Sequence, residues 1–496
     1  MKAVVIRRSG KFIVAALGCA ILVLAAVAGG LLTGGYDRTA TILNDELVRG
    51  LPVARPLRVL VPAGALYAPA IVANAGTGLH DESLFGKNHG VSVVLEVEED
   101  FDVCLKRLVS GGADIVWAGA DSFARAYPRM RSVNPVAFLL CGYSRGDDLL
   151  VARKAPSSPD DYRGATIACA ANTPSHFMAL YLLSLSGVKP SEVDWSFTRT
   201  PVDAVRLFAR GRADFCAAPR YALAPAIDGK TEITMVSSTG EAARLVAGLF
   251  IARESTLLFR RDQVGKFIMG WFDGLASLLR DTEASAALLA RELGTDAVEA
   301  RAEIGRYAFA GYAENRMFFL IDDSEWGGFP HLFDTAYTLH HGDAAEGPAI
   351  SGFARNTDLL VALEGDLKMF SAPGRDKPAA PVPGGTALPG RHSFYFPENR
   401  SVPGFASRGR LARFARDAHV FPGCAIALYG GEDTGEERWR NLSAQRVREV
   451  ARLLVSEHRI PVSRIILPND RGIGAGGKEE TARRVDAFLV APLRER

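Results

Sequence analysis

Two stretches of the chain, one hundred residues apart, share a pattern that decides the fold of its larger part. Residues 108–118 read LVSGGADIVWA, and residues 208–218 read FARGRADFCAA. Each completes an amphipathic run that predicts a helix, ends that helix at a glycine able to take the left-handed cap conformation, and starts a buried strand at Ala-Asp. A helix leading into a buried strand, repeated in this way, predicts two similar α/β lobes.

The surrounding sequence alternates short apolar strands with helical stretches. Residues 57–64 (LRVLVPAG) predict a strand that runs into a glycine turn, and residues 91–99 (VSVVLEVEE) predict the next strand after an intervening helix. Such alternation is typical of a parallel sheet covered by helices. We therefore expect an α/β fold over residues 57–370, with the second lobe at about 150–240.

Ligands of open parallel sheets bind at the carboxyl ends of the strands. Small residues end both repeated strands, which leaves room there, and Gly119 belongs to the first of them. Asp121 and Arg220 come just beyond the two strand ends and are candidates for ligand binding, with an ion pair on the lobe surface as the alternative for each. Asp114 and Asp214 precede the strands, away from that edge, and are expected to be structural.

Two further segments carry candidate ligand residues. Thr173 or Ser175 can cap a following helix, and the free N–H groups of such a helix start suit a carboxylate, sulfonate or phosphate group. Capping alone is the simpler interpretation. His176 could orient a ligand or be an ordinary, partly buried histidine. Leu66 and Tyr67, after the first strand, could form an aromatic wall of the site, or Tyr67 could belong to the core.

Three motifs give this region a family resemblance. Residues 161–168 read DYRGATIA, residues 171–176 read ANTPSH and residues 246–254 read VAGLFIARE. In this order they resemble the start of the second lobe, the ligand-facing turn and the return strand of the periplasmic solute-binding proteins of ABC importers, specifically the type II fold of the sulfonate, nitrate and thiamine-precursor group. The resemblance covers about residues 57–320. It implies a small ligand, expected to be anionic, in a cleft between two lobes.

The amino-terminal residues predict a membrane segment. Residues 12–33 (FIVAALGCAILVLAAVAGGLLT) are apolar and, at about 1.5 Å per residue, long enough to cross a bilayer as a helix. Four cations precede this run and no charge follows it before Asp37. Residues 1–36 are therefore expected to be a cytoplasmic tip and an inner-membrane anchor, with the bulk of the chain in the periplasm. A signal peptide cleaved after Ala28 is the alternative.

A linker and a small basic domain follow the α/β unit. Residues 371–390 (SAPGRDKPAAPVPGGTALPG) are rich in Pro, Gly and Ala, which predicts a tether whose flanking units need not touch. Residues 391–496 predict a small α/β domain with nineteen Lys and Arg against thirteen Asp and Glu. This basic balance fits affinity for an anionic polymer.

The carboxy-terminal segment carries a second family resemblance. Residues 441–447 (NLSAQRV), 460–465 (IPVSRI) and 483–486 (RRVD) resemble, in order and spacing, the motifs of the OmpA-like peptidoglycan-binding domain. In that family an Asp and an Arg grip the charged end of the peptide stem. The resemblance therefore implies a wall-binding site in this domain.

The two residues of that implied site differ in how well they match. Arg446 corresponds directly to the family's Arg. The acidic loop is shortened here to GGEDTG, so that Asp433 or Glu432 takes the role of the Asp. An Arg and a carboxylate a few ångströms apart can pair with both charges of a zwitterion. A salt bridge within the domain is the alternative.

Composition and motifs exclude other classes of protein. The chain has 58 Lys and Arg against 56 Asp and Glu, which argues against a dedicated nucleic-acid binder. It has no hydrolase, nucleotide-binding or metalloprotease motif, so we expect neither an enzyme nor a cofactor or metal. His331, His340 and His341 are expected in a solvated loop.

These observations predict a membrane-anchored periplasmic protein that captures or senses a small ligand and attaches to peptidoglycan. An ABC permease or another envelope protein is the expected partner. The alternative is a structural tether between membrane and wall, in which the α/β module docks a protein. A ligand that stabilises residues 57–370 would favour the first hypothesis.

Overall fold

A computed structural model of the 496-residue chain describes residues 55–492 apart from 63, 228–232, 325–326, 343–349, 371–385, 389, 432–438 and 468–481. The predicted membrane segment, most of the linker, and both Glu432 and Asp433 lie outside these residues. Among the helices that are described, none combines the length and the apolar character that a bilayer crossing requires.

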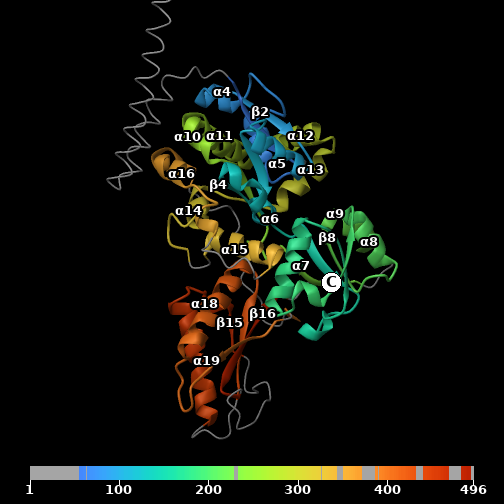
Figure 1. Cartoon of the computed structure of the whole chain (residues 1–496), viewed down its shortest axis with the longest axis vertical. Helices are drawn as coiled ribbons and strands as arrows, with labels where there is room; N and C mark the ends of the chain where they lie inside the picture. Colours follow the sequence, from blue (N-terminus) through green and yellow to red (C-terminus); the bar gives the residue numbers. More distant parts are fainter. Residues whose placement is uncertain are drawn as a thin grey trace, which may run out of the picture.

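The first lobe is built on a six-stranded sheet of order β11-β4-β10-β3-β1-β2 (Figure 1). Strands β1, β2 and β3 are parallel, whereas β10 runs antiparallel between β3 and β4. The strands are β1 (Leu57–Val61), β2 (Val93–Val97), β3 (Ile115–Gly119), β4 (Pro135–Ser144), β10 (Ala247–Arg253) and β11 (Tyr307–Phe309). Its helices are α3 (Ala68–Asn74), α4 (Leu84–His89), α5 (Phe101–Ser110), α6 (Ala120–Met130), α10 (Glu254–Phe259), α11 (Arg261–Arg280), α12 (Thr282–Leu293) and α13 (Ala297–Gly305). Lobe 1 thus combines residues 57–144 with residues 247–309.

The second lobe, residues 148–238, is built on a five-stranded sheet of order β7-β6-β8-β5-β9. Its strands are β5 (Asp148–Ala152), β6 (Thr166–Ala170), β7 (Asp194–Thr198), β8 (Phe215–Pro219) and β9 (Thr234–Ser238). Helices α7 (Pro174–Leu185), α8 (Pro201–Ala209) and α9 (Arg220–Ile227) complete this lobe. In lobe 1, β10 pairs with β3, the third parallel strand, and the chain reaches β10 directly from lobe 2. In lobe 2, β5 pairs with β8 in the same way, and the chain reaches β5 directly from lobe 1.

The two repeated stretches occupy equivalent positions in the lobes. Helix α5 leads through Gly111 into β3, and α8 leads through Gly211 into β8. Both glycines have positive φ, 81° and 73°, as the expected left-handed ends of the helices require. The prediction of a mixed α/β, two-lobed fold is confirmed.

After lobe 1 the chain continues in a series of helices: α14 (Tyr312–Phe318), α15 (Gly328–His341), α16 (Asp358–Ala362) and α17 (Glu364–Leu367). His331, His340 and His341 lie on α15, so the expectation of a solvated loop is wrong. The apolar residues Phe329, Leu332, Phe333 and Ala336 recur at helical spacing and bury one face of α15.

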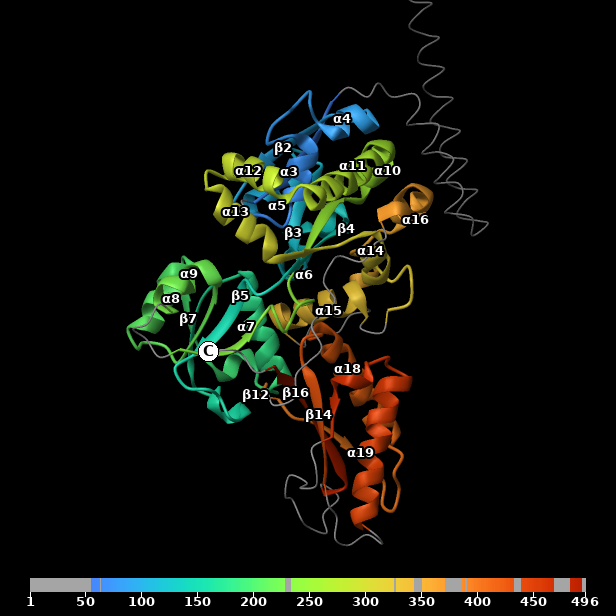
Figure 2. The ribbon, with the colours of Figure 1, turned by 180° about the vertical axis from the view of Figure 1, so that it is seen from behind.

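The carboxy-terminal domain, residues 386–491, has its own sheet of order β12-β16-β14-β15, with β13 also paired to β16. Its strands are β12 (Thr386–Ala387), β13 (His392–Tyr395), β14 (Ala425–Gly430), β15 (Ile465–Ile466) and β16 (Arg484–Ala491), and its long helices are α18 (Phe405–Val420) and α19 (Trp439–Ser456). The domain touches the α/β unit, although the linker left it free to stay apart: Tyr181 on α7 donates a 2.8 Å hydrogen bond to Asp417 on α18. Figure 2 shows α18 directly beside α15.

Candidate functional site

Two chain segments join the lobes, and they are bonded to each other. Residues 145–147 lead from β4 to β5, and residues 239–246 lead from β9 to β10. Gly146 N–H donates to Thr239 Oγ1 at 2.8 Å, and Ser144 N–H donates to the Val246 carbonyl at 2.9 Å. These two segments, which we call the hinge, therefore form one hydrogen-bonded unit.

Asp148, the first residue of β5, connects the hinge to the start of α7. Its carboxylate accepts hydrogen bonds from Ser144 Oγ at 2.9 Å and from Ser175 Oγ at 2.7 Å. Burial, together with the neighbouring charge of Asp147, raises the pKa of Asp148 to about 6. Ser175, a predicted ligand residue, is thus bonded to Asp148, the residue next to the hinge.

The start of α7 combines a helix cap with an aromatic cluster. Thr173 Oγ1 accepts a hydrogen bond from His176 N–H at 3.3 Å, which is the capping role that the sequence suggested. The His176 ring packs edge-on against Trp195 and Phe197, with centroids 5.0 and 5.2 Å away. Burial lowers the pKa of His176 to about 4, so its imidazole is neutral at pH 7 and can donate or accept a hydrogen bond.

Helix α6 of lobe 1 carries an acidic residue, Asp121, and a basic residue, Arg125, near His176. Asp121 is 3% exposed, and burial raises its pKa. A Cβ on Gly119 would lie 2.6 Å from Asp121 Oδ1, so the glycine makes room for this carboxylate. Arg125 is close enough to affect the pKa of both Asp121 and His176. The structure therefore gathers Asp121 and His176, predicted from different segments, around Arg125.

His340, on α15, lies close to His176 at the boundary between the two lobes. Its ring centroid lies 6.2 Å from that of His176, and burial lowers its pKa to about 3. His340 Nε2 and Arg125 Nε are buried and make no hydrogen bond to the residues that the structure describes. These two nitrogens are therefore buried polar groups without a hydrogen-bond partner among the described residues.

Tyr67 and Leu66 lie at the end of β1 and have different environments. Tyr67 is 1% exposed and packs edge-on against Trp117, with centroids 6.2 Å apart, yet its hydroxyl has no hydrogen-bond partner among the described residues. A Cβ on Gly248 would lie 2.4 Å from Leu66 Cδ2, so the Leu66 side chain packs directly against this glycine. Leu66 is therefore a core residue, while Tyr67 is buried with a hydroxyl that lacks a partner among the described residues.

Sequence reasoning missed a set of charged residues between Tyr67 and the hinge. Glu303 Oε1 and Tyr67 Oη lie 3.5 and 3.4 Å from the position of a Cβ on Gly64. Burial raises the pKa of Glu303, and Arg306 opposes that shift. Arg306 Nε lies 3.2 Å from Asp147 Oδ1. Glu303 and Arg306 come from α13 and its end, far along the chain from β1, and no local pattern marks them. The Asp147-Asp148 pair follows a glycine and could have been noticed as a charged turn between strands.

Arg220, the first residue of α9, lies against the hinge. Its Nε donates to the Gly146 carbonyl at 3.1 Å, and its N–H donates to the Asp147 carbonyl at 2.6 Å. Asp147 also feels its charge, because Arg220 counteracts the rise in pKa that burial causes at Asp147. Arg220 thus belongs with Asp147 at the hinge.

Arg446, the predicted wall-binding cation, is fully buried in the carboxy-terminal domain. Its Nε donates to the Arg400 carbonyl at 2.9 Å, one of its terminal nitrogens donates to the Pro397 carbonyl at 3.3 Å, and its guanidinium lies over the Phe396 ring. Arg446 therefore holds the turn after β13. Its proposed acidic partners lie outside the described residues.

Three or more His, Cys, Asp or Glu side chains that could hold a metal ion do not come together anywhere in the described part of the chain. The groups at the lobe boundary are instead suited to hydrogen bonding and charge pairing. Arg125, His176 and His340 form the first side of the boundary, and Tyr67, Asp147 and Glu303 form the second.

Comparison with known proteins supports a binding role for this unit. Residues 82–253, less than half of the chain, match the family model of the phosphonate ABC transporter, periplasmic substrate-binding protein. No curated protein sequence matches the chain. The family match supports a periplasmic substrate-binding module in the two-lobed region, a class of protein whose role is binding and not catalysis. The finer assignment to the sulfonate, nitrate and thiamine-precursor group stays a prediction.

Solved structures that align with this chain include sulfonate-binding proteins. The periplasmic aliphatic sulphonate binding protein SsuA from Escherichia coli is 15% identical, with a TM-score of 0.45, over 59% of this chain and 88% of that chain. The periplasmic sulfonate-binding protein SsuA from Methylobacillus flagellatus KT is 13% identical, with a TM-score of 0.47, over 66% of this chain and 99% of that chain.

Proposed function

We propose that this chain is an envelope solute-binding protein that captures or senses a small anionic ligand at the lobe boundary. The observation that carries the proposal is the meeting of Arg125, His176 and His340 there, with buried nitrogens that the described residues leave unbonded. The family match over residues 82–253 supports it. Residues 1–36 anchor the protein in the inner membrane, the carboxy-terminal domain attaches it to peptidoglycan, and an ABC permease or another envelope protein receives the ligand or the signal.

The two sides of the boundary suit a ligand with charges of both signs. Arg125 provides a full positive charge, and His176 and His340 can donate hydrogen bonds, for a phosphonate or sulfonate group. On the other side, Glu303 and Asp147 face Arg306 and Arg220, and the Tyr67 hydroxyl is a further acceptor. An ammonium group can pair with these carboxylates in exchange for the partners that they have within the protein, which include Arg306. The ligand class is therefore a small phosphonate or sulfonate that also carries an amine.

A matched set of four ligands tests this proposal on the full-length protein. Ethylphosphonate and ethanesulfonate carry the anion alone, while 2-aminoethylphosphonate and taurine add the amine. Ligand at a hundred times its Kd should stabilise the fold by about 2.7 kcal/mol, which thermal unfolding detects easily. We expect the amine-bearing member of at least one pair to shift Tm more than its partner.

Variants on one helix supply the control. Arg125→Gln should remove the shift, whereas Arg129→Gln, which changes an exposed arginine paired with Asp102, should leave it intact. Equal shifts in both variants would rule out this site, and no shift with any of the four ligands would contradict the proposed ligand class.

A structural tether is the second candidate function, and one observation favours it. Ser175 and Thr173, two of the residues predicted to contact ligand, already have hydrogen-bond partners within the protein. In a tether, the α/β unit docks a protein partner and binds no small molecule. Absence of any ligand-induced stabilisation, with intact binding to peptidoglycan, would support this function instead.

A further inference from the structure

Three parts of the protein meet at one carboxylate. Asp417, near the end of α18, accepts a 2.8 Å hydrogen bond from the hydroxyl of Tyr181 on α7 of lobe 2. His331 Nε2, from α15, lies 3.4 Å from the same carboxylate oxygen. Tyr181 is 1% exposed and Asp417 is 8% exposed, so water is largely excluded from this junction. A buried hydrogen bond to a charged group is stronger than an exposed one, so the junction holds the domain firmly.

The same end of α18 also contacts the hinge. Arg244, in the second hinge segment, donates its N–H to the Val420 carbonyl at 3.3 Å and a guanidinium hydrogen to the His419 carbonyl at 3.2 Å. A Cβ on Gly423 would lie 3.3 Å from the Gly240 carbonyl oxygen, so the two backbones are almost in contact. The carboxy-terminal domain therefore rests on the segment that must bend if the lobes move.

The docking surface of the domain is rigid. The buried guanidinium of Arg464 donates to the carbonyls of Ala418, Phe421 and Cys424, at 2.8 to 2.9 Å. These bonds fix the turn that follows α18. The turn that contacts the hinge is thus bonded to the rest of its domain.

Helix α15 extends the connection to lobe 1. The Phe333 ring packs edge-on against Phe123 and Tyr127 of α6, with centroids 5.3 and 5.6 Å away, and His341 Nε2 lies 3.1 Å from the Arg125 carbonyl oxygen. In Figures 1 and 2, α15 lies between lobe 1 and the carboxy-terminal domain. The domain thus holds lobe 2 and the hinge directly, and lobe 1 through α15.

We propose that the carboxy-terminal domain is a brace that sets the angle between the two lobes. If this domain is undocked, the lobes can adopt other angles; if the lobes close, the domain must move. This coupling is reciprocal, as any coupling between two equilibria must be. This consequence rests on the proposed function: if the lobes bind a ligand and the domain binds the wall, ligand capture changes the position of the wall-binding domain. The brace itself depends on neither.

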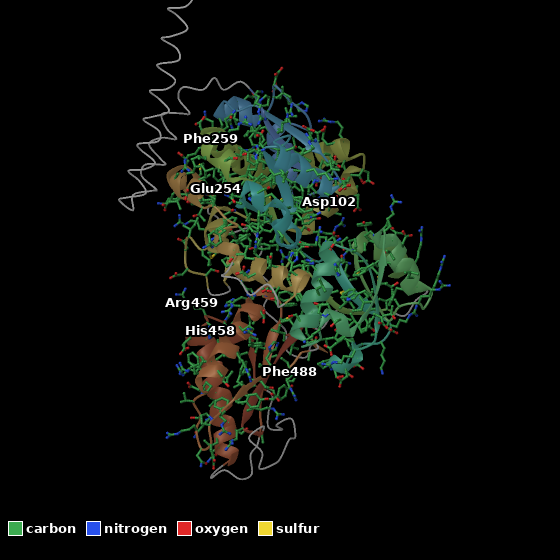
Figure 3. All side chains as sticks on the ribbon, viewed as in Figure 1. Asp102, Glu254, Phe259, His458, Arg459 and Phe488 are labelled. Carbon is green, nitrogen blue, oxygen red and sulfur yellow. The ribbon has the colours of Figure 1, made fainter. Side chains whose placement is uncertain are left out.

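A wedge at the docking surface tests the brace without any ligand. Gly423→Leu places a side chain against the Gly240 backbone, while Gly409→Leu, on the exposed side of α18 with nothing within 4 Å of its Cβ, is the matched control. Spin labels at Asp102→Cys and Val202→Cys report the interlobe distance, in a chain where Cys19 is serine. The two positions are equivalent in the repeat, Figure 3 shows Asp102 on lobe 1, and the five described native cysteines are buried.

We expect the wedge variant to broaden or shift the interlobe distance distribution and the control to match the parent chain. Hydrogen exchange of residues 414–421 measures undocking in the same samples and should speed up about tenfold in the wedge variant. Unchanged lobes in a chain whose domain has undocked would overturn the brace. Unchanged exchange in the wedge variant would also overturn it, because the close backbone contact on which it rests would then be absent.

A second pair of variants guards against misfolding of the wedge. Tyr181→Phe removes only the hydroxyl that Asp417 accepts, and Tyr162→Phe makes the same change at a buried lobe 2 tyrosine whose hydroxyl bonds to none of the described residues. Tyr181→Phe should give the same change in interlobe distances as the wedge, in a smaller fraction of molecules. Identical behaviour of the two phenylalanine variants would contradict the proposal.

Discussion

Asp114 and Asp214, one hundred residues apart, make the same backbone bonds in the two lobes. Each precedes the third strand of its sheet, and its carboxylate accepts the N–H of a residue at the start of the first strand, Arg58 at 3.0 Å and Thr166 at 2.9 Å. The N–H of each aspartate returns a bond to the carbonyl of that residue, at 3.0 and 2.9 Å. They differ in environment, because Asp114 is fully buried and Asp214 is exposed.

That difference predicts unequal costs of substitution. Asp114 also pairs with Arg55 and with Arg260, which is itself 15% exposed. Asp114→Asn leaves this arginine charge unpaired and should cost about 3 kcal/mol, whereas Asp214→Asn should cost about 1 kcal/mol or less. Urea unfolding of the two variants measures the free energies. Equal losses would show that the arginine cluster contributes nothing beyond the shared backbone bonds.

The Asp114 contribution should also depend on pH. Burial raises the pKa of Asp114, but hydrogen bonds from Arg55 and the Arg58 backbone outweigh that effect and lower it below the ordinary value. A lowered pKa stabilises the fold above the unfolded value of about 3.9, and this stability is lost as the pH falls through the folded pKa. The difference between the parent chain and Asp114→Asn should therefore shrink in strong acid.

Asp148 should show the opposite pH dependence. Its pKa is raised to about 6, so the folded state binds more protons than the unfolded state between about pH 4 and 6. Stability should thus decrease as the pH rises through this window, by on the order of 2 to 3 kcal/mol. Asp148→Asn should be less sensitive to pH over the same range. A parent chain and variant whose unfolding free energies change in parallel from pH 4 to 7 would contradict the raised pKa.

Arg446 provides a test of wall attachment. Arg446→Ala should abolish sedimentation with purified peptidoglycan, while Arg452→Ala, at an exposed residue of the same helix paired with Glu449, should not. Because Arg446 also holds the turn at Pro397 and Arg400, circular dichroism must show that the domain remains folded. Undiminished pelleting of folded Arg446→Ala would sink the wall-binding assignment of this residue.

Local patterns predicted much of the fold because their causes are local. A glycine that ends a helix and an apolar run that starts a strand can be read within ten residues, so the sequence alone predicts both copies of the repeat. The same type of pattern, the spacing of Phe329, Leu332, Phe333 and Ala336, marks α15 as a helix. The expectation of a loop was wrong because the three histidines carry no periodicity of their own.

The candidate site was predicted only in part because its residues converge through tertiary structure. Asp121 and His176 follow strand ends, where the sequence points to binding. Glu303 reaches the lobe boundary from α13, late in lobe 1, and His340 reaches it from α15, beyond both lobes. The bond between Tyr181 and Asp417 joins residues 236 positions apart. No periodicity or composition encodes such contacts, because they depend on how finished elements pack.

The crossing of β5 and β10 between the lobes also has a consequence for synthesis. Lobe 2 is one continuous segment, residues 148–238. In lobe 1, by contrast, β3 and β4 both pair with β10, which is synthesised only at residues 247–253. Until then, two strand edges that will later be covered are open to pairing with other chains. We therefore expect the later-made lobe to fold first, and the newly made amino-terminal half to be the part that depends most on a chaperone.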